Sequence, residues 1–115
     1  MARINHLLKV LPQVTVATAG TAVPLSALEL KVASVVVQWD PSNTGDIYIG
    51  ESDVTGTKCI KLNSGNPVIE ITVDDTAADE DSSVIDLAEI FVDAQLNGDK
   101  VNVAYLALSC VDYNS

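Results

Sequence analysis

The sequence predicts an all-β fold, namely a single-domain β-sandwich or jelly-roll-like barrel of about seven or eight short antiparallel strands, with a short N-terminal arm or helical turn. Two observations predict it. Segments rich in β-branched residues alternate with turn segments rich in Gly, Pro, Asn and Asp, at intervals of about 8–12 residues. The chain has 115 residues, the length of one domain. We expect an N-terminal arm over residues 1–12 and a sandwich domain over residues 13–115.

Five segments carry the strand signal, and turn signals separate them. The predicted strands are residues 31–39, 47–50, 58–62, 68–73 and 100–109. Further β-branched and small residues at 14–19 end at a glycine. Within 68–73 the alternation is irregular, which suggests a bulge. In residues 47–50 we expect Ile47 and Ile49 to face the core and Tyr48 to face outward.

Two further segments need a choice. Residues 87–93 alternate as a strand does, although Val84, Leu87, Ala88 and Phe91 also have helical spacing. We predict a strand over 87–93, with a helical turn before it as an open alternative. Residues 97–99 (Asn-Gly-Asp) predict a turn of hairpin type before the last strand.

Composition excludes several classes of function. The chain has 16 acidic and 6 basic residues and a formal net charge of −10, which argues against nucleic-acid and membrane partners. With 48% hydrophobic and 19% charged residues, the chain is not of the disordered type. Lys9, Pro12 and Gln13 interrupt the N-terminal apolar stretch, so we expect no signal peptide.

The N-terminal segment differs from the rest in charge. Residues 1–28 contain two bases and no acid, whereas residues 29–115 contain four bases and 16 acids. Ile4, Leu7, Leu8 and Leu11 have the i, i+3, i+4, i+7 spacing of an apolar helical face. The segment is either a first turn packed on its own core or an arm that docks on a neighbouring subunit or partner shell. The residues predicted to make the arm contact are Arg3, Ile4, His6, Leu7, Leu8 and Lys9.

Little in the sequence indicates catalysis. His6 is the only histidine and no GxSxG motif occurs, so we expect no triad, no cofactor, no metal and no enzyme activity. Cys59 and Cys110 could bridge, but without a secretory signal they are more often free and buried. Five carboxylates within residues 74–81 could hold Ca²⁺, although we favour a solvated loop.

Four motifs occur in an order that resembles small virion structural proteins of tailed bacteriophages, of the cement or decoration type. They are TAGTAVPL at 18–25, NTGDIYIGESDV at 43–54, DLAEIFVD at 86–93 and NGDKV at 97–101. The likeness covers residues 15–108 and depends mainly on NTGDIYIG.

The resemblance implies a protein that is made in the host cytoplasm and binds the outer face of an assembled capsid. There it would bridge neighbouring subunits of the major capsid protein and stabilise the shell. It also implies a homodimer or homotrimer. Besides the arm, exposed residues of the 43–46 loop and its neighbour would make contacts: Asn43, Thr44, Asp46 and Tyr48.

Two alternatives stay open at this point. The first is a glycan-binding or adhesin-like module of a phage tail or fibre, which requires Trp39 and Tyr48 to be exposed on one face. Trp39 and Phe91, however, are better suited to a core or an interface. That leaves Tyr48 and Tyr113 as the exposed candidates. A small metal-dependent enzyme requires residues 74–81 to hold an ion.

Overall fold

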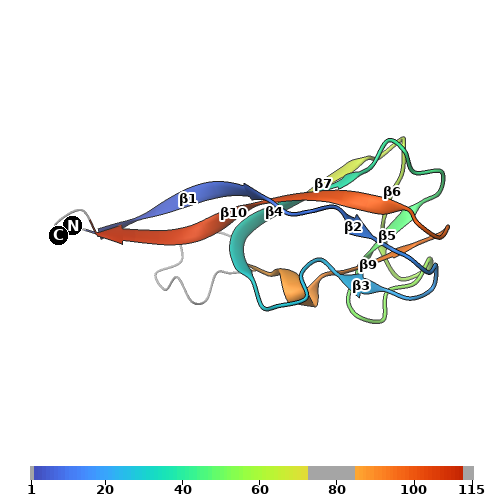
Figure 1. Cartoon of the computed structure of the whole chain (residues 1–115), viewed down its shortest axis with the longest axis horizontal. Coiled ribbons are helices and arrows are strands. Elements are labelled where there is room, and N and C mark those ends of the chain that lie inside the picture. The colour runs from blue at the N-terminus through green and yellow to red at the C-terminus, as the bar shows by residue number, and fades with distance from the viewer. Residues whose placement is uncertain (1, 73–84, 113–115) are drawn as a thin grey trace.

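The chain folds as a β-sandwich, as the sequence predicts (Figure 1). The computed structural model describes the backbone of residues 2–72 and 85–112, and the side chains of residues 8–72 and 85–107. Two antiparallel sheets and one 3-10 turn account for the regular structure of these residues. Among them, no helix is long and apolar enough to cross a membrane.

The elements follow one another along the chain with short connections. They are β1 (Ala2–Val10), β2 (Val14–Thr15), β3 (Val23–Pro24), β4 (Lys31–Trp39), β5 (Ile47–Gly50), β6 (Ile60–Leu62), β7 (Val68–Thr72), β8 (Ile85–Asp86), η2 (Leu87–Glu89), β9 (Phe91–Ala94) and β10 (Lys100–Asp112). The described residues thus hold ten strands where the sequence predicts seven or eight, because β3 and β8 are two-residue pairings too short to leave a pattern and β1 has the apolar spacing of a helix.

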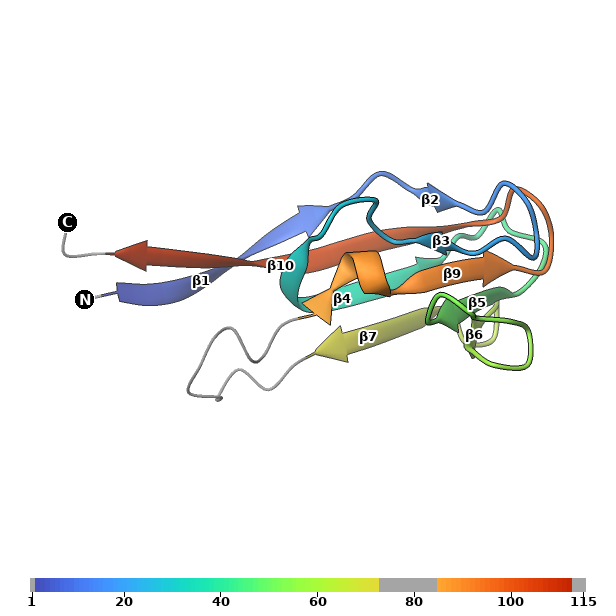
Figure 2. The same cartoon turned by 90° about the horizontal axis from the view of Figure 1, so that it is seen from below.

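The strands divide between a large and a small sheet. The large sheet has the order β1-β10-β4-β7, with β2 also on β10 and β8 also on β4. The small sheet has the order β3-β9-β5-β6. Figure 2 shows the long β1–β10 pair extending past the end of the remaining strands.

The core lies between the two sheets and consists mainly of inward-facing residues that alternate along β4, β10, β5 and β9. Val35 and Val37 of β4 are fully buried. Val101 and Val103 of the adjacent strand β10 are at most 1% exposed. From the small sheet, Ile47 and Ile49 of β5 are 0% and 2% exposed, which confirms the predicted orientation of this strand. The other members of the core cluster are Val16, Leu25, Val32, Leu62, Leu87, Val92 and Ala94.

The N-terminal segment is a strand, so the predicted helical turn is wrong. β1 pairs with β10 from Ala2 opposite Asp112 to Val10 opposite Ala104. The apolar spacing that suggests a helix cannot reveal this partner, which lies about a hundred residues further along the chain.

Beyond the sandwich, β1 and β10 continue as a two-stranded ribbon. The pairing between β4 and β10 ends at Ala107 opposite Val32. Residues 2–6 and 108–112 therefore pair with each other alone, and we call them the terminal ribbon. The ribbon projects from the body in both views (Figures 1 and 2) and contributes to the elongated shape of 51 × 25 × 24 Å.

Three local predictions need correction. Within residues 87–93, Leu87–Glu89 forms the turn η2 and the strand begins only at Phe91. Asp86 causes this, because its Oδ1 accepts hydrogen bonds from Ala88 N at 3.0 Å and Leu30 N at 3.1 Å. β7 alternates regularly and has no bulge in its pairing with β4.

The third correction concerns the turn before β10. Gly98 has a φ of +85°, as an Asn-Gly turn favours. The turn joins β9 of the small sheet to β10 of the large sheet, so it is not a hairpin.

Candidate functional site

The outer face of the large sheet, which points away from the core, is the first candidate. The registers Leu8–Leu106, Val10–Ala104, Val36–Glu70 and Gln38–Val68 place these pairs on the same side of the sheet. We call this surface the outer face. Its residues are Leu8, Val10, Ser34, Val36, Gln38, Val68, Glu70, Thr72, Asn102, Ala104 and Leu106.

This outer face has several exposed apolar side chains and one charged residue, although the chain as a whole is acidic. Leu8 is 69% exposed and Val10 is 72% exposed, while Glu70 is the only charged residue among those that form the face. An antiparallel sheet with one face in water normally alternates apolar and polar residues. β4 instead carries valine at 35, 36 and 37, on both of its faces, as strands covered on both sides do.

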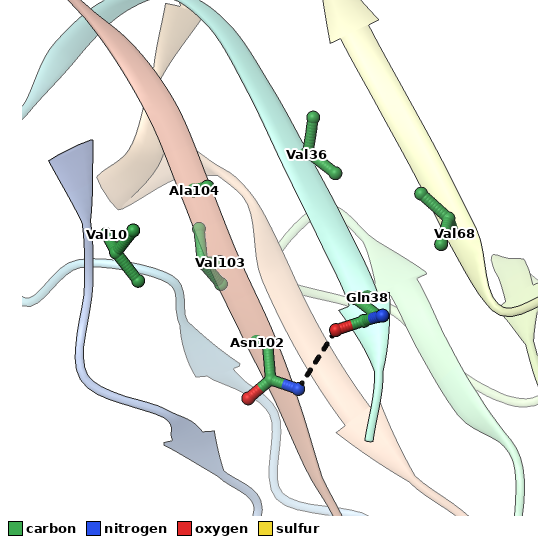
Figure 3. A pocket seen from close by; sticks show the side chains of 7 residues that line it. All are labelled: Val10, Val36, Gln38, Val68, Asn102, Val103 and Ala104. Atoms are coloured by element: carbon green, nitrogen blue, oxygen red, sulfur yellow. Dashed lines mark hydrogen bonds between the residues drawn. The ribbon is translucent and has the colours of Figure 1, made fainter. Parts of the chain in front are cut away.

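Two hollows indent the outer face. The larger has a volume of about 320 Å³ and is lined by Val10, Val36, Gln38, Val68, Asn102, Val103 and Ala104 (Figure 3). The smaller, of about 190 Å³, is lined by Leu8, Ser34, Val36, Glu70, Ala104, Tyr105 and Leu106. In Figure 3, Val10 and Val68 flank the larger hollow from the two edge strands of the sheet.

The polar groups at one end of the larger hollow already have partners. Asn102 Nδ2 donates to Gln38 Oε1 at 3.2 Å and to Asp40 Oδ1 at 3.1 Å. Gln13 Nε2 donates to Asn102 Oδ1 at 2.7 Å and to Asp40 Oδ1 at 3.1 Å. The side-chain amide of Asn102 therefore keeps its partners when an apolar molecule covers this hollow.

The terminal ribbon is the second candidate, and it includes part of the predicted arm. Arg3, Ile4 and His6 lie on the ribbon, and their side chains are outside the described residues, as is that of Leu7. Leu8 and Lys9 lie where β1 borders the sandwich, both exposed, with Leu8 on the outer face. Among the described residues, β10 from 108 to 112 has no strand on the side opposite β1, and a strand edge of this kind can pair with another chain.

Hydrogen bonds hold the predicted contact loop to the start of β10. Asn43 is only 6% exposed, contrary to the expectation of an exposed contact residue. Its Nδ2 donates to Lys100 O at 2.7 Å, and its Oδ1 accepts from Lys100 N at 2.9 Å. Asp99 holds the same loop by accepting from Gly45 N at 2.9 Å. These bonds fix the loop between β4 and β5 to the start of β10.

The neighbours of Asn43 differ in exposure. Thr44 is exposed, while Asp46 and Tyr48 are partly buried. Lys61 Nζ lies 5.8 Å from the centre of the Tyr48 ring. The structure does not bring this loop together with the ribbon, because Lys100 and Asp112 are at opposite ends of the 13-residue strand β10, which corresponds to about 40 Å.

Three buried carboxylates act as hydrogen-bond acceptors in the connections between strands. Asp40, Asp93 and Asp99 are 9%, 5% and 7% exposed. Asp93 Oδ1 accepts from Gly20 N at 2.9 Å and Ala94 N at 2.8 Å. Hydrogen bonds from the Ser42 hydroxyl, then from the Asn102 side chain and the Ser42 backbone, lower the pKa of Asp40 because they favour its charged form.

The described residues contain no group of three or more His, Cys, Asp or Glu side chains placed to hold a metal ion. The carboxylates at 74–81 that the sequence offers for Ca²⁺ lie outside those residues. Cys59 is partly buried with a free thiol. The side chain of Cys110 is outside the described ones.

The aromatic residues that the structure describes do not form one platform. Trp39 packs against the core from the large sheet and donates from Nε1 to Gly45 O at 2.9 Å. Tyr48 lies on the small sheet, on the side opposite the buried Ile47 and Ile49. Phe91 is partly buried, and Tyr113 is outside the described residues. The single exposed face with Trp39 and Tyr48 that a glycan-binding module requires is therefore absent from the described structure.

Sequence patterns point to Leu8 as a contact residue but not to Val10, Val36, Val68 and Ala104, which are further apolar residues of the outer face. For Val36 and Ala104, the signal that could have found them is the three consecutive valines at 35–37 in β4 and the unbroken apolar run at 103–108 in β10, where a half-exposed strand alternates. Comparison with protein-family models, curated proteins and solved structures finds no match for the chain.

Proposed function

We propose that the chain is a capsid decoration protein of a tailed bacteriophage, located on the outer face of the virion. It binds the assembled head and bridges neighbouring subunits of the major capsid protein. The observation that carries this proposal is the terminal ribbon, which projects from the sandwich and has no further strand beside it among the described residues. The resemblance of residues 43–54 to virion proteins supports it.

The ribbon suits attachment because of its backbone. A two-stranded ribbon is at best marginally stable alone in water. An added strand from a neighbouring protein would satisfy the open N–H and C=O groups by main-chain hydrogen bonds, while side chains would supply selectivity. The flexible end of a coat subunit is a partner of this kind.

The uneven distribution of charge along the chain favours one orientation of the protein on the capsid. β1 contributes Arg3 and Lys9 and no acid. The sandwich supplies most of the acidic residues, including Glu51 and Asp53 in the exposed connection after β5. An acidic surface that faces solvent keeps particles apart through like-charge repulsion.

Stabilisation follows from mass action. A protein that binds only the assembled shell lowers the free energy of that state by RT ln(1 + [L]/Kd), about 2.7 kcal/mol per site at a hundred times Kd. A copy that contacts two coat subunits must lose one set of contacts before the subunits separate. The shell therefore gains resistance to internal pressure without any chemical reaction.

The test uses phage heads assembled without this chain, mixed with the purified protein and sedimented. Deletion of residues 1–6 removes the β1 half of the ribbon and leaves the pairing of Leu7–Val10 with β10 in place. We expect the intact chain to co-sediment in a fixed ratio to coat subunits and the deletion variant to stay in solution with an unchanged thermal unfolding curve.

The control is Lys61→Glu on the small sheet, far from the ribbon in the strand order, which we expect to bind normally. Equal binding of the deletion variant and the intact chain would refute a role for the ribbon. Failure of the intact chain to bind these heads would refute the proposed function.

A further inference from the structure

The edge strands of the two sheets differ in how well they are protected against pairing with another chain. On the small sheet, β3 has two residues and includes Pro24, and β6 has three residues with Lys61 at its centre. Short length, proline and lysine are the usual means of blocking an edge strand. β7, at one end of the large sheet, has five residues, four of them β-branched, and contains no proline, glycine or lysine. β7 is therefore better suited than β3 and β6 to accept a further strand.

The backbone of β7 presents hydrogen-bonding groups on the side away from β4. Trp39 N donates to Pro67 O at 2.6 Å, and the antiparallel register of β4 and β7 continues from this pair. Hydrogen-bonded and non-hydrogen-bonded pairs alternate in such a ladder, so Ile69 and Ile71 bond to β4. The residues whose N–H and C=O groups point to the open edge are Val68, Glu70 and Thr72. Among the described residues no strand pairs with β7 on that side, which forms one margin of the large sheet in Figure 2.

The side chains of the same three residues lie on the outer face. Val68 is 44% exposed, and Glu70, also exposed, is the only charged residue of this face. The carboxylate lines the smaller hollow beside apolar residues such as Val36 and Leu106. The ion pair found among the described residues joins Lys58 to Asp53, so Glu70 has no cationic partner among them.

Glu70 determines which strand suits this edge. Residues directly opposite each other on one face of an antiparallel pair stabilise it when their charges are opposite and destabilise it when their charges are alike. A second copy paired over all five residues of β7 would bring Glu70 opposite Glu70. A strand with Lys or Arg at that position instead forms an ion pair, and the net charge of −10 attracts such a basic segment from a distance.

We propose that β7 is a docking edge for an extended segment of a partner protein, which adds to the large sheet as an antiparallel strand with a basic side chain opposite Glu70. Apolar or β-branched side chains, two positions before and after the basic one, lie opposite Val68 and Thr72. Main-chain hydrogen bonds supply the affinity in this mode of recognition, and the side chains supply the selectivity. The site is separate from the terminal ribbon, because β7 and β1 are at opposite ends of the strand order. It does not require the proposed capsid function.

The test is an NMR titration of the isotope-labelled chain with the end-blocked peptide Ser-Thr-Val-Lys-Val-Val-Ser. Paired antiparallel with β7, this peptide brings its lysine opposite Glu70, its threonine opposite Thr72 and its last valine opposite Val68. We expect the amides of these three residues, which face the open edge, to become protected from hydrogen exchange. The amides of Ile69 and Ile71 already bond to β4 and should keep their exchange rates.

A charge exchange tests the role of Glu70. Glu70→Lys should lower the affinity for the lysine peptide about fivefold, and a peptide with glutamate in place of lysine should bind this variant better than it binds the intact chain. Glu51→Lys is the matched control, because Glu51 is also exposed and lies in the connection after β5. It changes the net charge by the same amount, and we expect it to bind the lysine peptide within about twofold of the intact chain. Far-UV circular dichroism verifies that both variants fold.

Three results would overturn the proposal. They are no binding of the lysine peptide at about 1 mM, protection that appears along β1 instead of β7, and equal losses of affinity for Glu70→Lys and Glu51→Lys. None of them bears on binding to phage heads, which the deletion of residues 1–6 tests separately.

Discussion

Asn43 joins the loop between β4 and β5 to the start of β10, and we predict that this link contributes to the stability of the fold. Asn43→Ala removes both hydrogen bonds that join the 40–46 loop to the backbone of Lys100, at 2.7 and 2.9 Å. Lys100 O keeps one long bond from Asp40 N at 3.4 Å, whereas Lys100 N loses the side-chain acceptor seen in the structure. A lost hydrogen bond costs about 1 kcal/mol, and a buried donor without a partner costs about 1–3 kcal/mol.

The variant should therefore lose about 2–4 kcal/mol of unfolding free energy. That is a large part of the 5–15 kcal/mol typical of a domain. Urea unfolding followed by fluorescence of Trp39, the only tryptophan, measures it. Trp39 reports on this loop directly, because its Nε1 donates to Gly45 O.

Asn66→Ala is the matched control. Asn66 is exposed, and its Nδ2 donates to Lys61 O at 3.2 Å in a surface turn, so we expect a change within about 0.5 kcal/mol. The denaturant slope should be the same for both variants and the intact chain. Equal, small losses for both variants would refute the claim that Asn43 is a structural clamp.

Three further predictions concern the same end of the sandwich. Hydrogen bonds, that of the Ser42 hydroxyl first, lower the pKa of Asp40 in the folded state, so its contribution to stability is present above the unfolded pKa of about 3.9 and is lost as pH falls through the lower folded value. Asp40→Asn should flatten this part of the acid limb in urea titrations between about pH 5 and pH 2, and an unchanged acid limb would contradict the assignment. Trp39→Phe removes the bond to Gly45 O and should cost about 0.5–1.5 kcal/mol in urea unfolding followed by circular dichroism. Gly98→Ala forces a Cβ into a backbone with φ of +85° and should cost about 1–2 kcal/mol, measured in the same way; a neutral result would contradict the left-handed turn.

The strands that the sequence predicts correctly are those whose own residues show a clear pattern of buried positions. The dense valine run of β4 matches residues 31–39 in full, and the alternation in β5 assigns Ile47 and Ile49 to the core. The Asn97-Gly98 turn is predicted at the right place. The sheets that this turn connects are not predicted, because the residues of a turn do not determine to which sheet the next strand belongs.

The remaining errors arise where distant residues decide the local structure. Ile4, Leu7, Leu8 and Leu11 fit a helical face, but pairing with β10 makes residues 2–10 a strand. Asn43 looks like an exposed loop residue until Lys100 comes within hydrogen-bond distance. The apolar outer face depends on the register of four strands, which no single stretch of the sequence specifies.

The proposed function is tested most directly by counting copies of the chain in purified phage particles. Quantitative mass spectrometry of particles from the host culture gives the ratio of this chain to the major capsid protein. A shell-wide decoration protein predicts hundreds of copies in a simple ratio to coat subunits. A handful of copies per particle would place the chain in a tail or fibre, and its absence from the particles would contradict the account altogether.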